Sequence, residues 1–230
     1  MEDMNREKKF VPRIDTKLKK RIVKVPEVIY KASGIIFMDK RIKSFLFTND
    51  LSIICNTNAQ AIMCVYPFTP QLSIINGILD VASVPVFPGV GGGTTTGFRT
   101  LNIAMQAELL GAFGVVVNAP MDNDTIKKLN QILDVPIIAT VISENDDILG
   151  KVRAGARVLN VAGGLKTASL VRHCRELLGP EFPIIATGGH TDEHILETIE
   201  AGANAISYTP LSSSDIFKDV MDTYRKYKKK

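Results

Sequence analysis

The amino-acid sequence predicts an α/β protein, a (β/α)8 TIM barrel with an N-terminal helical extension. From residue 43 onward, eight short apolar runs alternate with amphipathic stretches. The apolar runs are continuous, which is typical of parallel strands that are covered on both faces. Their starts also repeat in two alternating kinds. Eight strands alternating with helices close into a barrel, and a doubly wound or flavodoxin-like sheet rarely has eight strands in so regular a series.

The individual elements follow from hydrophobic spacing. Between the strands, apolar residues recur three and four positions apart, which indicates helices with one buried face. These helical stretches cover residues 72–83, 100–111, 125–133, 169–179 and 193–202. The predicted strands are residues 44–49, 61–66, 85–90, 114–118, 136–142, 158–162, 183–188 and 205–209.

An internal repeat supports the same order of elements. One kind of strand follows a Val-Pro or Phe-Pro step, in VPVF, VPIIA and FPIIA. The other kind follows a helix ending in Gly-Ala, in GAFGVVVN, GARVLNVA and GANAISYT. A glycine ends a helix in the left-handed conformation, and a proline opens a strand where no ladder donor is needed. The chain therefore consists of four βαβα units of about 45–50 residues, a period that indicates a repeat architecture.

We expect one barrel domain over residues 43–230, preceded by the extension at 1–42. In the extension, Ile14, Leu18 and Ile22 lie four residues apart, as on one face of a helix. Pro26 can open a second short helix that reaches Ala32 or beyond. We expect the extension either to plug the N-terminal mouth of the barrel or to pack against a partner subunit. The second alternative would make the protein a homo-oligomer.

Composition narrows the function classes. The three cysteines are an odd number within apolar or helical runs, which favours reduced thiols and a cytoplasmic protein. The net charge of +4 arises from lysines near the two ends of the chain, which predict solvated faces and not a nucleic-acid partner. The first ten residues lack the apolar core of a signal peptide. Because no run reaches about 18–20 apolar residues, we expect no membrane partner.

Phosphate binding is the strongest functional prediction. In a barrel, function lies at the C-terminal ends of the strands. After the sixth, seventh and eighth strands come the loops AGGLKTASL, TGGHTDEHI and YTPLSSSDI, each leading into a helix. Glycine pairs expose backbone N–H groups, and a helix N-terminus adds donors and partial positive charge. The alternative is that these residues only make tight turns and helix caps.

The end of the chain resembles a known group of barrels. The segment IIATGGHTDEHILETIEAGANAISYTP, with VLNVAGG before it, is similar to the closing segment of the ribulose-phosphate-binding barrels. This resemblance covers about residues 155–215 and implies that the loops after strands six to eight hold a phosphate. It assigns phosphate contacts to Gly163, Gly164, Gly188, Gly189 and Ser212. The chain departs from the pattern at Pro210, which removes one backbone donor.

A second glycine-rich loop, VFPGVGGGTTTGFRT, covers residues 86–100. It predicts a mobile lid or a second anion cradle helped by Arg99, and the plain alternative is a flexible surface connection. It is not a nucleotide-binding P-loop, because Phe98 stands where that motif has a lysine. Polar and glycine residues at the strand ends complete the ligand-binding prediction: Asn49, Tyr66, Gly91, Gly92, Gly93, Thr94, Arg99, Asn118, Asn160 and Thr209.

Three residues are candidates for catalysis. Asp50 and Glu144 follow the first and fifth strands and could act as base or as ligands of a divalent cation. The alternatives are a helix cap for Asp50 and a solvated loop carboxylate for Glu144. His190 is a candidate acid, and we interpret His194 as a surface or packing residue. Although the two histidines fit the HxxEH metal motif, the residues between them are typical of a helix start.

Three functions remain open on these residues. The first is an enzyme that binds a small phosphorylated metabolite and transfers protons, as an isomerase, epimerase or lyase. The second is a metal-assisted hydrolase using the divalent cation Mg²⁺ or Mn²⁺. The sequence assigns no other cofactor, although a flavin at the glycine loops is a further alternative. The third is a non-catalytic ligand-sensing barrel. A Schiff-base aldolase needs a desolvated lysine in the mouth of the barrel. No lysine lies within a predicted strand, and Lys166 is the only lysine near the predicted active face, so this mechanism is not expected.

Overall fold

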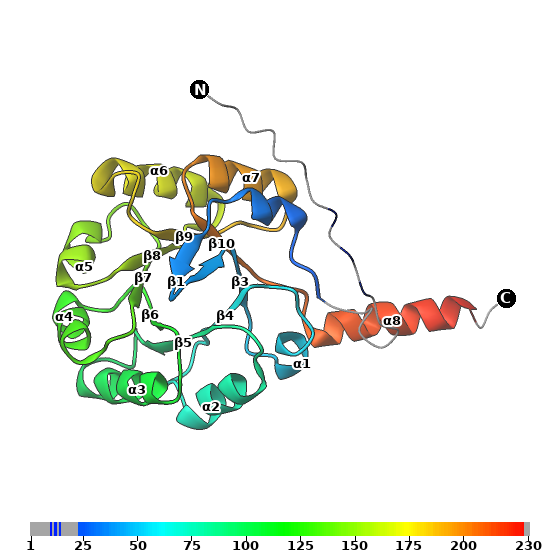
Figure 1. The fold of residues 1–230 in the computed structure, drawn as a ribbon, viewed down its shortest axis with the longest axis horizontal. Coiled ribbons are helices and arrows are strands. Elements are labelled where there is room, and N and C mark those ends of the chain that lie inside the picture. Colours follow the sequence, from blue (N-terminus) through cyan, green and yellow to red (C-terminus); the bar gives the residue numbers. More distant parts are fainter. Residues whose placement is uncertain (1–9, 11, 13, 15–22, 228–230) are drawn as a thin grey trace.

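The computed structural model describes residues 10, 12, 14 and 23–227, and it confirms the predicted barrel. Eight parallel strands close in the order β10-β3-β4-β5-β6-β7-β8-β9 (Figure 1). All eight predicted strands are present, although most are one or two residues shorter. They are β3 (Ser44–Phe47), β4 (Ala61–Cys64), β5 (Val86–Gly91), β6 (Val115–Val117), β7 (Ile137–Val141), β8 (Val158–Val161), β9 (Ile184–Thr187) and β10 (Ala205–Tyr208).

Helices surround the barrel, and each of the five predicted amphipathic stretches overlaps one of them (Figure 1). The helix α8 extends away from the barrel. In the described part of the chain, no helix is long and apolar enough to cross a membrane. The helical elements of the barrel are α1 (Leu51–Ile54), α2 (Leu72–Val81), α3 (Gly97–Leu109), α4 (Asn123–Ile132), α5 (Ile148–Ala154), η2 (Gly164–Lys166), α6 (Thr167–Leu178), α7 (Asp192–Glu200) and α8 (Ser213–Tyr227).

Two apolar clusters explain the continuous apolar strands. One lies between strands and helices, and the other fills the barrel. Successive residues of a strand point to opposite faces, so each strand contributes to both clusters. The inner cluster contains Phe45, Ala61, Met63, Phe87, Val116, Ile138, Val158, Ile185 and Ala205. Apolar side chains therefore cover both faces of each strand over most of its length, which is why the sequence shows no regular polar alternation.

The N-terminal extension corrects one prediction. Its helix after Pro26 is present only as the 3-10 helix η1 (Glu27–Lys31), and the chain then forms an antiparallel hairpin from β1 (Ile35–Phe37) and β2 (Lys40–Ile42). Met38 and Asp39 have φ of 43° and 66°, the left-handed conformation that a two-residue hairpin turn requires. The first predicted helix lies largely outside the described residues, since residues 15–22 are not described.

The hairpin closes the N-terminal mouth of the barrel. Ile35, Phe37 and Ile42 are buried and belong to the inner cluster. The Phe37 ring packs edge-on against Phe45 and Phe87, with centroids 6.1 and 5.0 Å apart. The plug that was predicted as a helix is thus built as a hairpin, which leaves the opposite mouth as the open end.

Candidate functional site

Polar side chains line the inside of the C-terminal mouth. Four consecutive strands each carry a polar residue two positions after the residue that belongs to the inner apolar cluster. These polar residues are Thr140 (β7), Asn160 (β8), Thr187 (β9) and Ser207 (β10). Register pairs Thr140 with Asn160 and Thr187 with Ser207. The Asn160 amide donates to Thr140 Oγ1 at 3.3 Å. One half of the barrel therefore ends in a polar layer above an apolar one.

A pocket opens beside this layer. It has a volume of about 470 Å³, and we call it the main pocket. One wall comes from η2, the start of α6 and the ends of β9 and β10, and the other comes from the turn before α7 and from α7 itself. Its lining residues are Gly164, Leu165, Thr167, Ala168, Thr187, Gly188, Gly189, His190, Thr191, His194, Glu197, Thr198, Ser207 and Thr209.

The Gly188–His190 turn offers hydrogen-bond donors to the main pocket. The backbone N–H groups of Gly189 and His190 donate to none of the described residues. Gly189 has a φ of +73°, which favours glycine there. Gly188 is needed for another reason, because a Cβ would lie 2.8 Å from Ile206 Cγ2 and 2.9 Å from Ile195 Cγ1. The turn thus combines close packing below with two free donors above.

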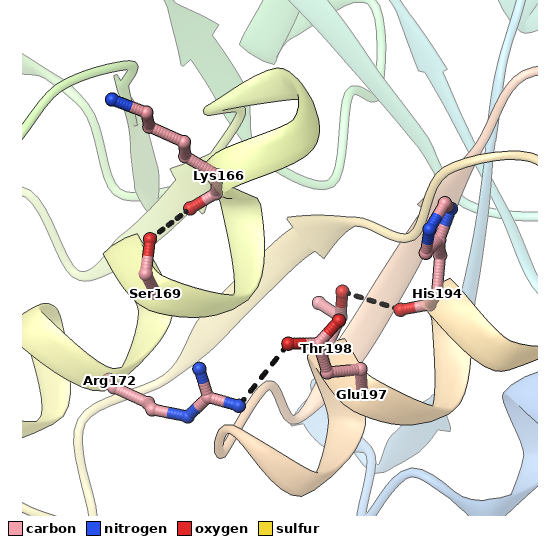
Figure 2. Close-up of polar contacts among 6 residues, drawn as sticks. All are labelled: Lys166, Ser169, Arg172, His194, Glu197 and Thr198. Carbon is pink, nitrogen blue, oxygen red and sulfur yellow. Dashed lines mark hydrogen bonds and ion pairs between the residues drawn. The ribbon is translucent and has the colours of Figure 1, made fainter.

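Two imidazoles border the same turn. His190 and His194 both line the main pocket, and a Cβ at Gly189 would lie 3.2 Å from His194 Cβ. Figure 2 shows the first turns of α7, where Thr198 Oγ1 donates to the His194 carbonyl at 2.8 Å. It also shows Arg172 of α6 paired with Glu197 at 3.4 Å. His194 is an exposed surface residue, and its place on the pocket wall was not predicted.

The predicted phosphate contacts divide between two places. Gly164, Gly188 and Gly189 line the main pocket, whereas Gly163 and Ser212 do not. The catalytic candidate His190 and the predicted ligand-binding residue Thr209 also line it. Gly163 lies directly before Gly164, facing Leu170 and the start of α6. The Ser212 hydroxyl is engaged in capping α8, since it accepts from Asp215 N at 3.1 Å and donates to Asp215 Oδ2 at 2.6 Å.

The second glycine loop forms a smaller pocket across the mouth. This second pocket has a volume of about 210 Å³, and six predicted ligand residues line it: Tyr66, Gly91, Gly92, Gly93, Thr94 and Asn118. The loop is closed on itself, because Gly92 N donates to Thr95 O at 2.8 Å and Thr100 Oγ1 donates to the same carbonyl at 3.0 Å. Arg99 lies outside it, in an open depression with Phe98 and Asn102.

Asp50 caps α1. One of its carboxylate oxygens accepts from Ser52 N at 2.8 Å and from Ile53 N at 3.2 Å, and the other accepts from Ser213 Oγ. These hydrogen bonds, that from Ser213 first, lower the pKa of Asp50 from its ordinary value. The carboxylate does not line the main pocket, and the structure matches the capping alternative for this residue.

Glu144 lies on the loop between β7 and α5, where it is exposed and away from the main pocket. Among the described residues, no group of three or more histidine, cysteine, aspartate or glutamate side chains could hold a metal ion. Asp50, Glu144 and His190 therefore do not converge on one cation.

Two asparagines carry buried, unpaired side-chain oxygens. Asn49 donates to Val65 O at 3.1 Å, and Asn160 donates to Thr140, yet neither side-chain oxygen has a partner among the described residues. The hydroxyl of Ser207 is likewise buried and unpaired. All three lie toward the C-terminal mouth. Ser207 and Thr140 were not predicted as site residues, although each is a polar residue two positions after an inward-facing apolar one.

A buried lysine holds the loop that carries Asn118. Lys151 of α5 is 4% exposed, and its ammonium donates to Ala119 O at 2.9 Å and to Met121 O at 3.1 Å. Burial lowers the pKa of Lys151. Lys166 does not line the main pocket, so neither lysine is placed to form a Schiff base there.

Comparison with known proteins identifies the fold class. No protein-family model and no curated protein matches the sequence. Among solved structures, phosphonopyruvate hydrolase in complex with oxalate and Mg²⁺ has a TM-score of 0.62 at 12% identity, covering 82% of this chain and 83% of that one. A putative phosphonomutase from Burkholderia cenocepacia J2315 has a TM-score of 0.59 at 16% identity, covering 82% and 92%. Mandelate oxidase with (S)-2-phenylpropionate has a TM-score of 0.61 at 11% identity, covering 77% and 68%. At these identities the likeness shows the TIM-barrel fold alone.

Proposed function

We propose that this protein is an enzyme that binds a small phosphorylated metabolite in the main pocket and transfers protons on it, as isomerases, epimerases and lyases do. The observation that carries the proposal is the Gly188–His190 turn, whose two free N–H groups lie beside two imidazoles. Backbone donors of this kind suit a phosphate, because they need no side chain and follow directly after a strand end.

The histidines are the acid and base of this proposal. Imidazole is the side chain most often used for proton transfer near neutral pH. His190 and His194 line the pocket, whereas Asp50 is engaged as a cap and Glu144 lies on another loop. One imidazole would accept a proton from the ligand while the other donates one. The names of the structural neighbours are those of barrel enzymes, which is in keeping with catalysis at this mouth.

A matched pair of variants at Gly189 tests the proposal. Thermal unfolding is measured against inorganic phosphate and a panel of sugar phosphates, with sulfate and matched chloride as controls. A ligand that binds only the folded protein raises the Tm. Gly189→Asp adds a negative charge at the turn, and Gly189→Asn has nearly the same volume and tolerates a left-handed φ. We expect the aspartate to weaken phosphate binding by at least about tenfold more than the asparagine does.

The outcomes separate the functions. Equal losses in the two variants, or no phosphorylated compound stabilising the wild type beyond the chloride control, would remove the phosphate site. Stabilisation without turnover in any assay of isomerisation, epimerisation or bond cleavage would favour a ligand-sensing barrel. Turnover that depends on added Mg²⁺ or Mn²⁺ would favour the metal-assisted hydrolase.

A further inference from the structure

The deep wall of the main pocket carries an unpaired hydroxyl. Ser207 is 4% exposed, lines the pocket, and has no hydrogen-bond partner for its Oγ among the described residues. Its own carbonyl accepts from Gly188 N at 3.4 Å, so the backbone of Ser207 lies next to the turn that is proposed to hold the phosphate. Buried polar groups are normally paired, and a buried hydroxyl aimed into a cavity is therefore placed for a ligand.

The groups around Ser207 are hydroxylated and uncharged. Thr187 and Thr209 line the same wall, and Thr187 Oγ1 lies 3.2 Å from Thr167 Oγ1 and donates to Val161 O at 3.4 Å. Below them lies the inner apolar cluster, which includes Ile185 and Ala205. A ligand atom that reaches this wall therefore meets neutral hydrogen-bonding groups and hydrocarbon.

Charge is confined to the opposite wall. The titratable side chains that line the main pocket are His190, His194 and Glu197, and all three belong to α7 or to the turn before it. The nearby basic residues Lys166 and Arg172 do not line the pocket. A carboxylate or second phosphate buried against Ser207 would lose its hydration without gaining a cation, which is strongly unfavourable.

We propose that the ligand of the main pocket is a monophosphate whose buried end is uncharged and carries a hydroxyl or carbonyl group that Ser207 binds. This inference rests on the proposed phosphate site and adds the chemistry of the rest of the ligand. It excludes phosphorylated carboxylic acids and bisphosphates. The selection comes from Ser207 at the inner end, while the Gly188–His190 turn holds the phosphate at the outer end.

Two pairs of probes of similar size test the selection by calorimetric titration of the full chain. Glycerol 3-phosphate and dihydroxyacetone phosphate end in neutral groups, whereas 2-phosphoglycolate and 3-phosphoglycerate end in carboxylates. We expect the neutral probes to bind at least about tenfold more tightly than inorganic phosphate. The acids should bind no more tightly than inorganic phosphate does. Tighter binding of the acids than of inorganic phosphate overturns the inference.

Ser207→Ala assigns the effect to the residue. The substitution removes one hydroxyl, and we expect the neutral probes to lose about five- to tenfold in affinity while inorganic phosphate changes less than about twofold. Ser169→Ala is the control, because Ser169 lies on the exposed face of α6 and donates to Lys166 O at 2.9 Å (Figure 2). An unchanged preference in Ser207→Ala overturns the inference and leaves the phosphate site standing. Failure of every phosphorylated probe to bind the wild type overturns the phosphate site itself.

Discussion

The two mouths of the barrel differ in whether their buried polar groups have hydrogen-bond partners. At the N-terminal mouth, polar side chains are paired: Ser44 Oγ accepts from Gln60 N at 3.0 Å, and Gln60 Oε1 accepts from Lys43 N at 2.8 Å. At the C-terminal mouth, Asn49, Asn160 and Ser207 each have an unpaired buried atom. An unpaired buried group lowers stability, so the N-terminal mouth favours stability, and the unpaired groups of the C-terminal mouth are those that the proposed ligand would use.

Arg175 shows how completely the N-terminal side is paired. Its guanidinium donates to the carbonyls of Gly179, Phe182 and Gly202 and to Asn204 Oδ1, at 2.6–3.0 Å. These acceptors lie at the end of α6 and just before β9 and β10. At the C-terminal mouth, Lys151 holds the loop after β6 through only two carbonyls, and the loops there surround the two pockets. The contrast predicts that substitutions at one mouth change stability and substitutions at the other change binding.

The largest expected effect is at the hairpin plug. Phe37→Ala should reduce the free energy of unfolding by about 3 kcal/mol, because the ring is buried against Phe45 and Phe87. Chemical denaturation measures the loss. Ile36→Ala is the control, since the neighbouring side chain is 69% exposed and should change stability by less than about 0.5 kcal/mol. Similar effects of the two substitutions would mean that the plug does not support the barrel.

The next effect is at the clamp. Arg175→Met keeps a long aliphatic stem but removes the guanidinium, which leaves several carbonyl groups without a donor. We therefore expect the free energy of unfolding to fall by about 2–3 kcal/mol. Arg172→Met on the same helix should be nearly neutral, because its pair with Glu197 is 3.4 Å long and exposed. Phosphate binding should stay unchanged in Arg175→Met at a temperature where the variant is folded. A loss of binding would contradict the separation of the two mouths.

The smallest expected change in the free energy of unfolding comes from replacing one serine at each mouth, and the two replacements should differ. Ser44→Ala removes a buried acceptor and should cost about 1 kcal/mol, whereas Ser207→Ala removes an unpaired hydroxyl and should be neutral or slightly stabilising. Register places Ser44 beside Ile206, so the two serines belong to neighbouring strands. Equal destabilisation in denaturant unfolding would show that Ser207 has a role in folding.

Some of the site could be predicted because it depends on local sequence. Gly164, Gly188, Gly189 and His190 follow strand ends, and any barrel brings strand ends together at one mouth. The six predicted residues of the second pocket were predictable for the same reason. Other assignments depend on partners that are distant in sequence. Asp50 is engaged by Ser213, 163 residues away, and nothing near Asp50 in the sequence indicates that contact.

The sequence by itself determined the number and order of the strands, the parallel barrel and the glycine turns at its C-terminal mouth, because hydrophobic period and turn residues act over a few neighbours. Only the tertiary structure decided three other features: that residues 35–42 form a plug, that His194 and Ser207 line the main pocket, and that Asp50 is a cap. Each of these depends on which side chains meet across the barrel. These side-chain contacts are set by strand register and by packing between segments far apart in the chain, which local spacing does not encode.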